Sequence, residues 1–495
     1  DYVLLKKYIT NPVQQTNEEV FKANTNFAFD IFKELNKEDK DKNVTISPLS
    51  ISTAISMVYQ GAGTTTKDAI ANALRYKGLD IATVDKSYKD LLGYLNQADP
   101  KVSLNINNSI WYREGLKVKD DFLSVNKDVF NANIASLDFS KPDSTDKING
   151  WISDATKGKI PSMIEPPISS DALMYLVNAV YFKGQWTNVF EQNNSIAGYF
   201  TNSKNERKNV VYMKKRESGE FGSGNDYKAI RLPYGDGNIA MYCILPSEGV
   251  SVNDFINTLD SSKWNTIKQS IRKSQDLDLT LPRFKVEYGT KSLVESLGTM
   301  GMGEAFKPSA DFSGITPGLS ISDVFHKSIV EVNEKGTEAS AVTVVMATPS
   351  VILPSKDVFS APRPFVYVIA DDKTGTVLFM GKASDIAEQD MGMISIDDKY
   401  NGRTIQLSKG QSIRIGLPNN GTTAYVWSYL QMPDQKVLKC GKEYCIVSSD
   451  VPGAGGTNYW EYQSVDSGST TIKLQFTRPG DEVPPRVFSL NVEVK

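Results

Sequence analysis

The pattern of hydrophobic residues changes near Asp390. Before this position, some segments repeat apolar residues at helical spacing and others alternate apolar with polar residues; after it, only alternation remains. Apolar residues recur at every second position in the segments 405–407, 413–417, 472–476 and 488–494. Short alternating strands separated by turn residues are typical of a small β-sandwich. The sequence therefore predicts a separate all-β domain after Asp390.

The part before Asp390 combines helices with strands. The segment 17–37 repeats apolar residues near helical spacing, which predicts an amphipathic helix. The segment 227–246 consists of two apolar runs around the turn residues 235–238, which predicts a hairpin. With 495 residues, the chain also exceeds what one hydrophobic core supports. We expect a mixed α+β domain followed by the sandwich.

The composition is that of an ordinary globular protein. Hydrophobic residues make up 40% of the chain, aromatic residues make up 10%, and the formal net charge is -3. This charge gives no reason to expect a nucleic acid or a membrane surface as partner. No run approaches the roughly 18 apolar residues of a membrane span. The chain begins at Asp1 without an apolar signal segment, so we expect that any secretion signal has been removed.

The chain has a single histidine, His326. Catalytic Ser/His/Asp and Cys/His arrangements need a base beside the nucleophile, and H-E-x-x-H metal sites need two imidazoles. No phosphate-binding G-x-x-x-x-G-K-[ST] sequence is present. His326 lies in the alternating segment 321–332, where a hydrogen-bonded core histidine is expected. We therefore expect that the protein is not an enzyme and has no cofactor and no metal site.

Three cysteines, Cys243, Cys440 and Cys445, are too few for a disulfide framework. The spacing of Cys440 and Cys445 permits a small disulfide across a hairpin, and it equally permits two free thiols. The sequence leaves both alternatives open.

One stretch, residues 333–353, contradicts simple expectations of secondary structure. It has the β-branched content of a buried strand, yet it contains Pro349 and is followed by Pro354. Its first residues and several other stretches resemble the serpin family, in order and in spacing, across about 17–386. These stretches are NVTISPLSI, INGWISDATKGKI, LVNAVYFKGQW, LTLPRFKVEYG, LGTMGMGEAF, ADFSGI, HKSIVEVNEKGTEASAVT and RPFVYVIADDKTGTVLFMGK. The resemblance implies an α+β serpin fold, with a large central β-sheet, helices and an exposed reactive loop that begins near Glu334.

This resemblance explains the stretch as a strand that has not yet entered a sheet. From position 337, every second residue is small or compact: Thr337, Ala339, Ala341, Thr343, Val345 and Ala347. A strand that turns such side chains inward can enter between two strands without displacing core volume. Gly336 suits the hinge of this movement because it has no Cβ. The predicted hinge and inserting face are Glu334, Gly336, Thr337, Ala339, Ala341 and Thr343.

Entry of the loop into the sheet would release enough energy to do mechanical work. Each new ladder hydrogen bond contributes roughly 0.5 to 1.5 kcal/mol, so ten or more contribute on the order of 10 kcal/mol. This rivals the total stability of a domain, which is about 5 to 15 kcal/mol. Some fourteen inserted residues, at about 3.3 Å each, carry their end on the order of 45 Å. We expect a metastable native state.

The resemblance also implies a mechanism. In inhibitory serpins, a serine protease attacks the loop, forms an acyl-enzyme, and is carried across the molecule and distorted before hydrolysis finishes. The family spacing from Glu334 places the reactive bond between Ser350 and Val351, with other bonds within 346–353 left open. The small Ser350 suits the pocket of an elastase- or subtilisin-like protease.

Four residues match the polar cluster that serpins have beneath the opening of the sheet: Ser47, Ser50, Asn178 and His326. Such a cluster can exchange hydrogen bonds as the strands part. Trp186 matches the tryptophan near the point of first insertion. Ordinary buried packing is the alternative for all five residues.

The domain after Asp390 resembles the chagasin family of cysteine-protease inhibitors in three loops. The first loop, in LPNNGTTAYVW, matches at Asn420, Thr422, Thr423, Tyr425 and Trp427, while Gly421 replaces a proline and Ala424 a glycine. The second loop is intact as Gly453, Ala454, Gly455 and Gly456. In the third loop, Arg478 and Pro479 match and Gly480 replaces a tryptophan. The implied mechanism is a non-covalent wedge of three loops in a papain-like active-site cleft.

The sequence thus predicts a dual protease inhibitor, monomeric and secreted or held at the cell surface. Its expected partners are a serine protease, bound covalently, and a papain-like cysteine protease, bound reversibly. The predicted parts are an N-terminal extension 1–16, the serpin domain 17–388, a linker 389–393 and the chagasin-like, immunoglobulin-like sandwich 394–495. The alternative is a non-inhibitory serpin scaffold with an immunoglobulin-like adhesion module. Bulky, charged or proline residues on the inserting face between 337 and 343 would favour this alternative, and none is present.

Overall fold

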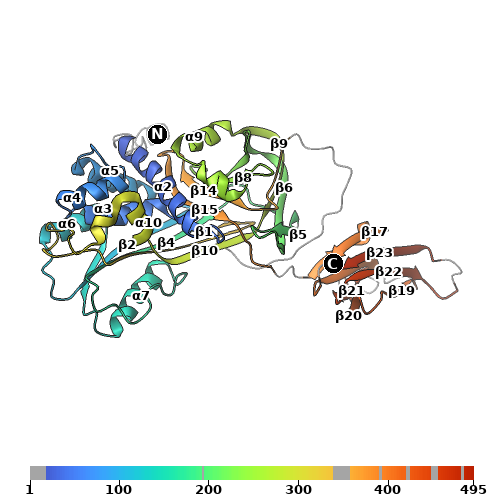
Figure 1. Cartoon of the computed structure of the whole chain (residues 1–495). Helices are drawn as coiled ribbons and strands as arrows, with labels where there is room; N and C mark the ends of the chain where they lie inside the picture. Colours follow the sequence, from blue (N-terminus) through green and yellow to red (C-terminus); the bar gives the residue numbers. More distant parts are fainter. Residues whose placement is uncertain are drawn as a thin grey trace, which may run out of the picture.

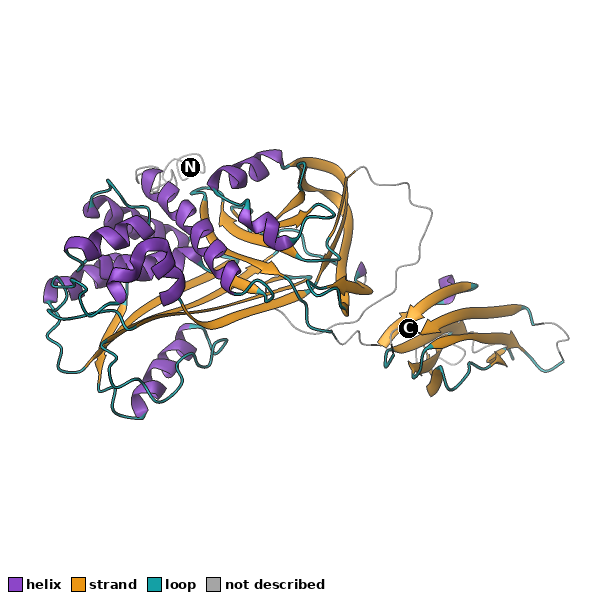
Figure 2. Cartoon of the chain, in the orientation of Figure 1, coloured by secondary structure: helices purple, strands orange, loops and turns teal. Residues whose placement is uncertain are grey.

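The computed structural model describes residues 18–191, 194–337, 357–389, 393–407, 409–419, 424–447, 455–480 and 484–494. Helices and long strands make up the chain as far as about residue 389, and strands dominate after it (Figures 1 and 2). The buried hydrophobic residues of the first part end at Ile386, and a separate core begins at Ile394. An α+β domain followed by an all-β domain, as predicted, is confirmed. The predicted division at 388 and 394 stays a prediction.

The helices of the α+β domain gather around its sheets (Figure 2). They are α2 (Glu18–Glu38), α3 (Pro48–Tyr59), α4 (Thr64–Ala73), α5 (Ile81–Leu95), α6 (Asp120–Phe130), α7 (Asp143–Ala155), α8 (Val252–Asn257), α9 (Ser261–Ser270) and α10 (Val294–Leu297), with the short η3 (Gly298–Met302) and η4 (Gly303–Phe306). The predicted first helix is confirmed as α2, which buries Phe27, Ile31 and Phe32 on one face. Every residue of α3 is buried, so this helix lies inside the domain.

A six-stranded sheet runs between α3 and α7, which both contact its strands (Figure 1). Its strands, in spatial order, are β10 (Phe284–Ser292), β11 (Asp323–Asn333), β12 (Gly336–Thr337), β4 (Met174–Gln185), β2 (Val102–Arg113) and β3 (Asn133–Leu137). Residues 323–328 of β11 pair directly and in parallel with residues 175–180 of β4. Farther along, the short β12 lies between the same two strands. The sheet is therefore closed at one end of the β4–β11 pair and parted at the other.

The second sheet of this domain has nine strands. In order, these are β1 (Val44–Ile46), β15 (Thr376–Ala383), β14 (Phe365–Asp371), β8 (Ile239–Pro246), β7 (Tyr227–Pro233), β6 (Arg207–Ser223), β9 (Arg272–Pro282) and β13 (Asp357–Ser360), with β5 (Ile196–Thr201) paired to β6. The predicted hairpin is confirmed as the antiparallel pair β7–β8. β14 and β15 are buried along their whole length and are mainly apolar, with Asp371, Thr376 and Lys382 as their buried polar or charged residues.

The all-β domain consists of two four-stranded sheets. One contains β16 (Met393–Ile396), β18 (Ser412–Asn419), β21 (Gly456–Ser464) and β20 (Leu438–Val447); the other contains β17 (Arg403–Leu407), β23 (Arg486–Val494), β22 (Gly468–Thr477) and β19 (Val426–Gln431), with the short helix η5 (Asp398–Tyr400) before β17. Alternate residues of these strands turn inward around Trp460 and Tyr462. The predicted β-sandwich is confirmed.

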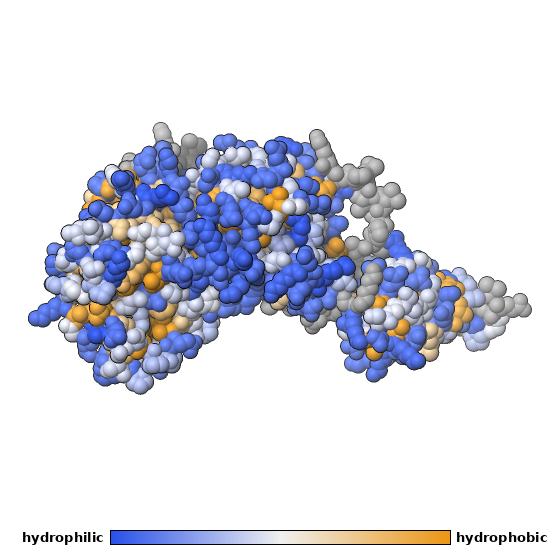
Figure 3. Space-filling model, viewed as in Figure 1, coloured by the Kyte–Doolittle hydropathy of each residue, from blue (hydrophilic) through white to orange (hydrophobic). Residues whose placement is uncertain are grey.

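The surface shown in Figure 3 is mainly hydrophilic, with apolar residues in small scattered areas. Among the residues that the structure describes, no helix has the length and apolar character needed to cross a membrane.

Candidate functional site

The predicted hinge lies where the chain leaves β11. Asn333 ends β11, Glu334 and Lys335 form a turn, and Gly336 and Thr337 make up β12. β12 pairs with β11 on one side and with β4 on the other. The first two residues after the turn therefore already lie between the strands that the loop would have to separate.

Gly336 occupies a position that only glycine fits. Its φ of 143° lies in the region that L side chains rarely adopt, and an added Cβ would clash with the carbonyl oxygen of Gly184 in β4. The next residue, Thr337, is 2% exposed, and its hydroxyl lies 3.0 Å from the hydroxyl of Tyr234. The chain thus turns into the sheet at Gly336, and the side chain of Thr337 lies in the interior.

A buried ion pair holds the turn before β12. Nε of Arg283 donates to both carboxylate oxygens of Glu334 at 2.8 Å, and the hydroxyl of Ser195 donates to one of them. The Arg283 side chain is 10% exposed and the Glu334 side chain 3%. Removing one partner of such a pair costs about 3 to 5 kcal/mol, because the other charge stays buried without compensation. Arg283 therefore fixes the hinge glutamate.

Trp186 is a second residue that holds the hinge in place through hydrogen bonds. Its indole Nε1–H donates to the carbonyl of Asn333 at 2.8 Å, and its backbone N–H donates to the carbonyl of Lys335 at 2.9 Å. The indole stacks on Tyr234, with ring centroids 4.4 Å apart and planes 13° from parallel. The tryptophan therefore bonds to both sides of Glu334 and also contacts the tyrosine that meets Thr337.

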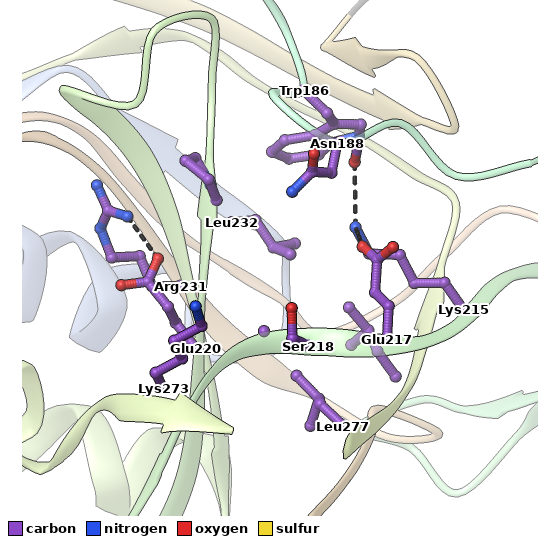
Figure 4. Close-up of a pocket in the computed structure, with 13 residues that line it drawn as sticks. Trp186, Asn188, Lys215, Glu217, Ser218, Glu220, Arg231, Leu232, Lys273 and Leu277 are labelled. Carbon is purple, nitrogen blue, oxygen red and sulfur yellow. Dashed lines mark hydrogen bonds and ion pairs between the residues drawn. The ribbon is translucent and has the colours of Figure 1, made fainter. Parts of the chain in front are cut away.

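A cavity of about 320 Å³ borders Trp186 (Figure 4). Figure 4 shows charged groups of its wall already engaged: Arg231 pairs with Glu220 at 2.6 Å, and Lys215 donates to the carbonyl of Asn188 at 3.0 Å. Such compensated charges leave little to recognise a ligand.

The predicted polar cluster lies along the closed part of the β4–β11 pair. His326 and Asn178 are direct partners across that pair, and Nδ1 of His326 lies 2.6 Å from Oδ1 of Asn178. The amide of Asn178 donates to Ser50 Oγ and to Asn108 Oδ1, and the backbone N–H of Ser47 donates to Nε2 of His326 at 3.3 Å. The structure thus brings Ser47, Ser50, Asn178 and His326 together.

The bonds of His326 define its protonation state. Nε2 accepts a hydrogen bond, so the ring proton lies on Nδ1 and is donated to Asn178. Burial lowers the pKa of His326 to about 3, which keeps the imidazole neutral. The bond between His326 and Asn178 crosses the β4–β11 pair and would have to be exchanged if the two strands separated.

Many predicted site residues lie outside the residues that the structure describes. They are Ala339, Ala341, Thr343, Ser350 and Val351 in the reactive loop, Asn420, Gly421, Thr422 and Thr423 in the first sandwich loop, and Gly453 and Ala454 in the second. Their assignments stay predictions.

The described parts of the three sandwich loops meet at one end of that domain. Asn419, before the first loop, pairs with Gly456, the last residue of the second loop, while Val426 pairs with Thr477 just before the third. A Cβ at Gly456 would lie 2.7 Å from the carbonyl oxygen of Ile446, which explains the glycine there. The described residues next to the three loops therefore lie at one end of the sandwich, which is compatible with the proposed wedge.

An aromatic and cationic stack joins the first and third loops. Tyr425 stacks on Phe476 with ring centroids 5.3 Å apart, and the Arg478 guanidinium lies 5.2 Å from the Tyr425 ring centroid. Trp427 lies beneath, 5.0 Å from Phe476, and donates to the carbonyl of Pro418 at 3.0 Å. These side chains form a rigid surface beside Pro479 and Gly480, which are both exposed.

Cys440 and Cys445 are free thiols with different partners. Sγ of Cys440 lies 2.9 Å from Nε2 of Gln435, and Sγ of Cys445 lies 3.3 Å from Nδ2 of Asn419. The disulfide alternative left open by the sequence is not present in the structure. Within the described residues, no group of three or more His, Cys, Asp or Glu side chains could hold a metal ion.

Sequence reasoning missed four residues of the site: Ser195, Tyr234, Arg283 and Asn108. Arg283 follows Pro282 between two alternating apolar runs, and a charged residue at that place is a weak signal that a partner is buried nearby. Asn108 lies in an alternating segment, where its polar side chain at a core position was the available signal. Ser195 and Tyr234 carried no signal of this kind.

The sequence models of two families match the chain. The model described as serpin (serine protease inhibitor) matches residues 22–386, and the model described as chagasin family peptidase inhibitor I42 matches residues 406–492. Both families are protease inhibitors and not catalysts.

Individual proteins and solved structures are similar to the α+β domain. An uncharacterised serpin-like protein of Methanosarcina acetivorans is 33% identical over 73% of this chain and 84% of its own length. The leukocyte elastase inhibitor of Bos taurus is 32% identical over 74% of this chain and 99% of its own. The thermophilic serpin tengpin in its native state has a TM-score of 0.68 and 31% identity, covering 75% of this chain and 95% of its own. Thyroxine-binding globulin in complex with thyroxine also has a TM-score of 0.68, with 28% identity, covering 74% of this chain and 99% of its own.

Proposed function

Because this chain belongs to the serpin family and carries a chagasin-family domain after it, we propose that it inhibits two classes of protease. The α+β domain is a suicide substrate that traps a serine protease as a covalent acyl-enzyme. The sandwich is a reversible inhibitor of papain-like cysteine proteases. The protein acts as a monomer outside the cell or at the cell surface, where it meets its target proteases.

One observation carries the proposal for the α+β domain: β12 lies between β4 and β11. The loop continues from Thr337, which is already paired in the sheet, so its further entry extends the pairing that β12 makes with β4 and β11. Six direct residue pairs of β4 and β11 would separate and be replaced by pairs with the loop on both sides. Two new ladders replace one, which favours the inserted state by roughly 0.5 to 1.5 kcal/mol for each added hydrogen bond.

The proposed reaction starts at the bond between Ser350 and Val351. The protease serine oxygen attacks the carbonyl carbon of Ser350, an ester forms, and the new amino group of Val351 takes the proton and leaves. Entry of the loop then carries the ester-linked protease on the order of 45 Å before water attacks the ester. His326 and Asn178 exchange their bonds with each other for bonds to the entering strand.

An elastase- or subtilisin-like protease is the proposed target. A small residue such as Ser350 fills a narrow specificity pocket and offers no charge to a trypsin-like one. Similarity to leukocyte elastase inhibitors supports this choice.

The sandwich is proposed to fill a papain-like cleft with its three loops. The stack of Tyr425, Phe476 and Arg478 supplies a rigid contact beside the third loop. Because no bond is cleaved, the inhibited enzyme recovers its activity when the complex dissociates.

The alternative function is a non-inhibitory serpin scaffold joined to an immunoglobulin-like binding module. The similarity to thyroxine-binding globulin, solved with thyroxine, is the observation that favours it. The small, buried Thr337 at the start of the inserting face favours inhibition.

Denaturing electrophoresis tests the proposal. The chain, tagged at its C-terminus, is incubated with pancreatic elastase or subtilisin. We expect a covalent band that contains residues 1–350 and the protease, and a released fragment 351–495 that carries the tag and the whole sandwich. On a native gel the tag should stay with the complex, because β13, β14 and β15 remain in their sheet. Cleavage without a covalent band would refute trapping, and papain activity in the same samples tests the sandwich separately.

A further inference from the structure

The chain after β15 stays attached to the α+β domain. Ile386 is buried, and the side chain of Asn43 bonds to the backbone of Ser384 and Asp385. The serpin match ends at residue 386 and the second match begins at residue 406. The attachment therefore continues into a segment that neither family accounts for.

Gln389 is the last residue of this attachment that the structure describes before residue 393. Its backbone N–H donates to the carbonyl of Asn209 at 3.0 Å. Its Oε1 accepts from the N–H of Val211 at 2.9 Å, and its Nε2 donates to the carbonyl of Arg283 at 2.7 Å. Three hydrogen bonds from one residue fix it to the side of β6 that faces β9 and to Arg283, the single residue between β9 and β10.

The side-chain amide of Gln389 acts here as a peptide group would. The β6–β9 ladder ends at the pair of Tyr212 and Pro282, and Arg283 then donates its N–H to the carbonyl of Val211 at 2.8 Å. The amide, which has one acceptor and a donor, bridges the remaining N–H of Val211 and carbonyl of Arg283. Without it, both backbone groups lose their partner in a partly buried place. Gln389 therefore sets the backbone position of Arg283.

The same Arg283 holds the hinge through its side chain, by the buried pair with Glu334. We propose that Gln389 is a positioning residue, which keeps the Arg283 guanidinium in place on Glu334 and so controls how readily the hinge opens. The consequence for inhibition rests on the proposed loop insertion, whereas the hold on the hinge does not. Gln389, which lies in the segment leading from the α+β domain to the sandwich, thereby takes part in controlling the hinge of the α+β domain.

Hydrogen exchange of the full-length protein, followed by mass spectrometry, tests this role. The amides of Trp186 and Phe190, which donate to the carbonyls of Lys335 and Glu334, report on the hinge. We expect Gln389→Ala to speed exchange in residues 186–190 and 333–337 at least threefold. Gln389→Glu keeps the acceptor for Val211 but loses the donor to Arg283, so it should have at least the same effect. Glu388→Ala is the control because Glu388 is exposed.

A second pair of proteins distinguishes a positioning role of Gln389 from a general loosening of the α+β domain. In a Glu334→Gln protein, where the ion pair is already broken, Gln389→Ala should change exchange at the hinge by less than twofold. An equal change in both backgrounds, or no change in the native background, would overturn the proposal. If the native protein also fails to trap a protease, the proposed function is wrong, and the exchange rates still decide the role of Gln389.

Discussion

Lowering the pH from 6.5 to 4.5 should destabilise the folded chain through His326. Burial lowers the pKa of His326 from 6.5 to about 3. Between these values the unfolded chain carries a proton that the folded chain excludes, so the free energy of unfolding falls as the pH falls. One pH unit is worth about 1.4 kcal/mol at the full difference of one proton, and because the unfolded histidine is already half protonated at pH 6.5, the loss over this interval is about 2.3 kcal/mol. The folded chain excludes the proton because a protonated ring could not accept from the N–H of Ser47, so the loss appears as lower stability of the whole domain.

Nuclear magnetic resonance measures the protonation state of His326 directly, because the chain has only one histidine and hence one imidazole to follow. We expect its ring signals to stay those of the neutral Nδ1–H form down to pH 4.5. Urea unfolding at the two pH values measures the loss in stability. The control is His326→Gln, which keeps a hydrogen-bonding side chain but cannot titrate.

The carboxylates contribute equally to both proteins, so the difference between the two pH dependences belongs to His326. A folded-state titration near pH 6.5, or the same pH dependence in protein and control, would refute the reasoning.

Three substitutions test other parts of the account. Glu334→Gln should cost about 3 to 5 kcal/mol, seen as a lower melting temperature, because Arg283 stays buried without its counter-charge; adding Arg283→Met should recover part of the loss, and a further loss would contradict this. Thr343→Arg should convert the inhibitor into a substrate, with cleavage but no covalent band, since an unpaired charge opposes burial; unchanged trapping would show that this residue does not turn inward. Gly480→Trp is predicted from the sequence to lower the inhibition constant for papain roughly tenfold or more. The φ of 99° at Gly480 strains any side chain by roughly 1 to 2 kcal/mol. We therefore expect the measured inhibition constant to fall by less than tenfold.

The fold was largely predictable because periodicity is a local signal. The helix α2, the hairpin β7–β8 and the alternating strands of the sandwich each follow from the spacing of apolar residues along their own segment. The family motifs supplied the rest of the architecture, since periodicity alone does not give the order of strands in a sheet.

The site was only partly predictable because its bonds join distant segments. The motif indicated Glu334, but its partner Arg283 lies 51 positions earlier and no local rule connects them. Gly336 was assigned to the hinge for its freedom of φ, and the structure adds the close approach of Gly184. The replacement at Gly480 was visible in the sequence, whereas its positive φ was not.

A reversible lock on the β4–β11 pair tests the central claim most directly. Ala179 and Lys327 are direct partners in that pair, so Ala179→Cys with Lys327→Cys places two thiols on neighbouring strands. The account predicts that the oxidised protein is cleaved by elastase without a covalent band, and that a reductant restores the band. The two single-cysteine variants, which cannot form this lock, should trap the protease with or without oxidant. A covalent band of undiminished yield from the fully oxidised double variant would show that the loop does not enter between β4 and β11.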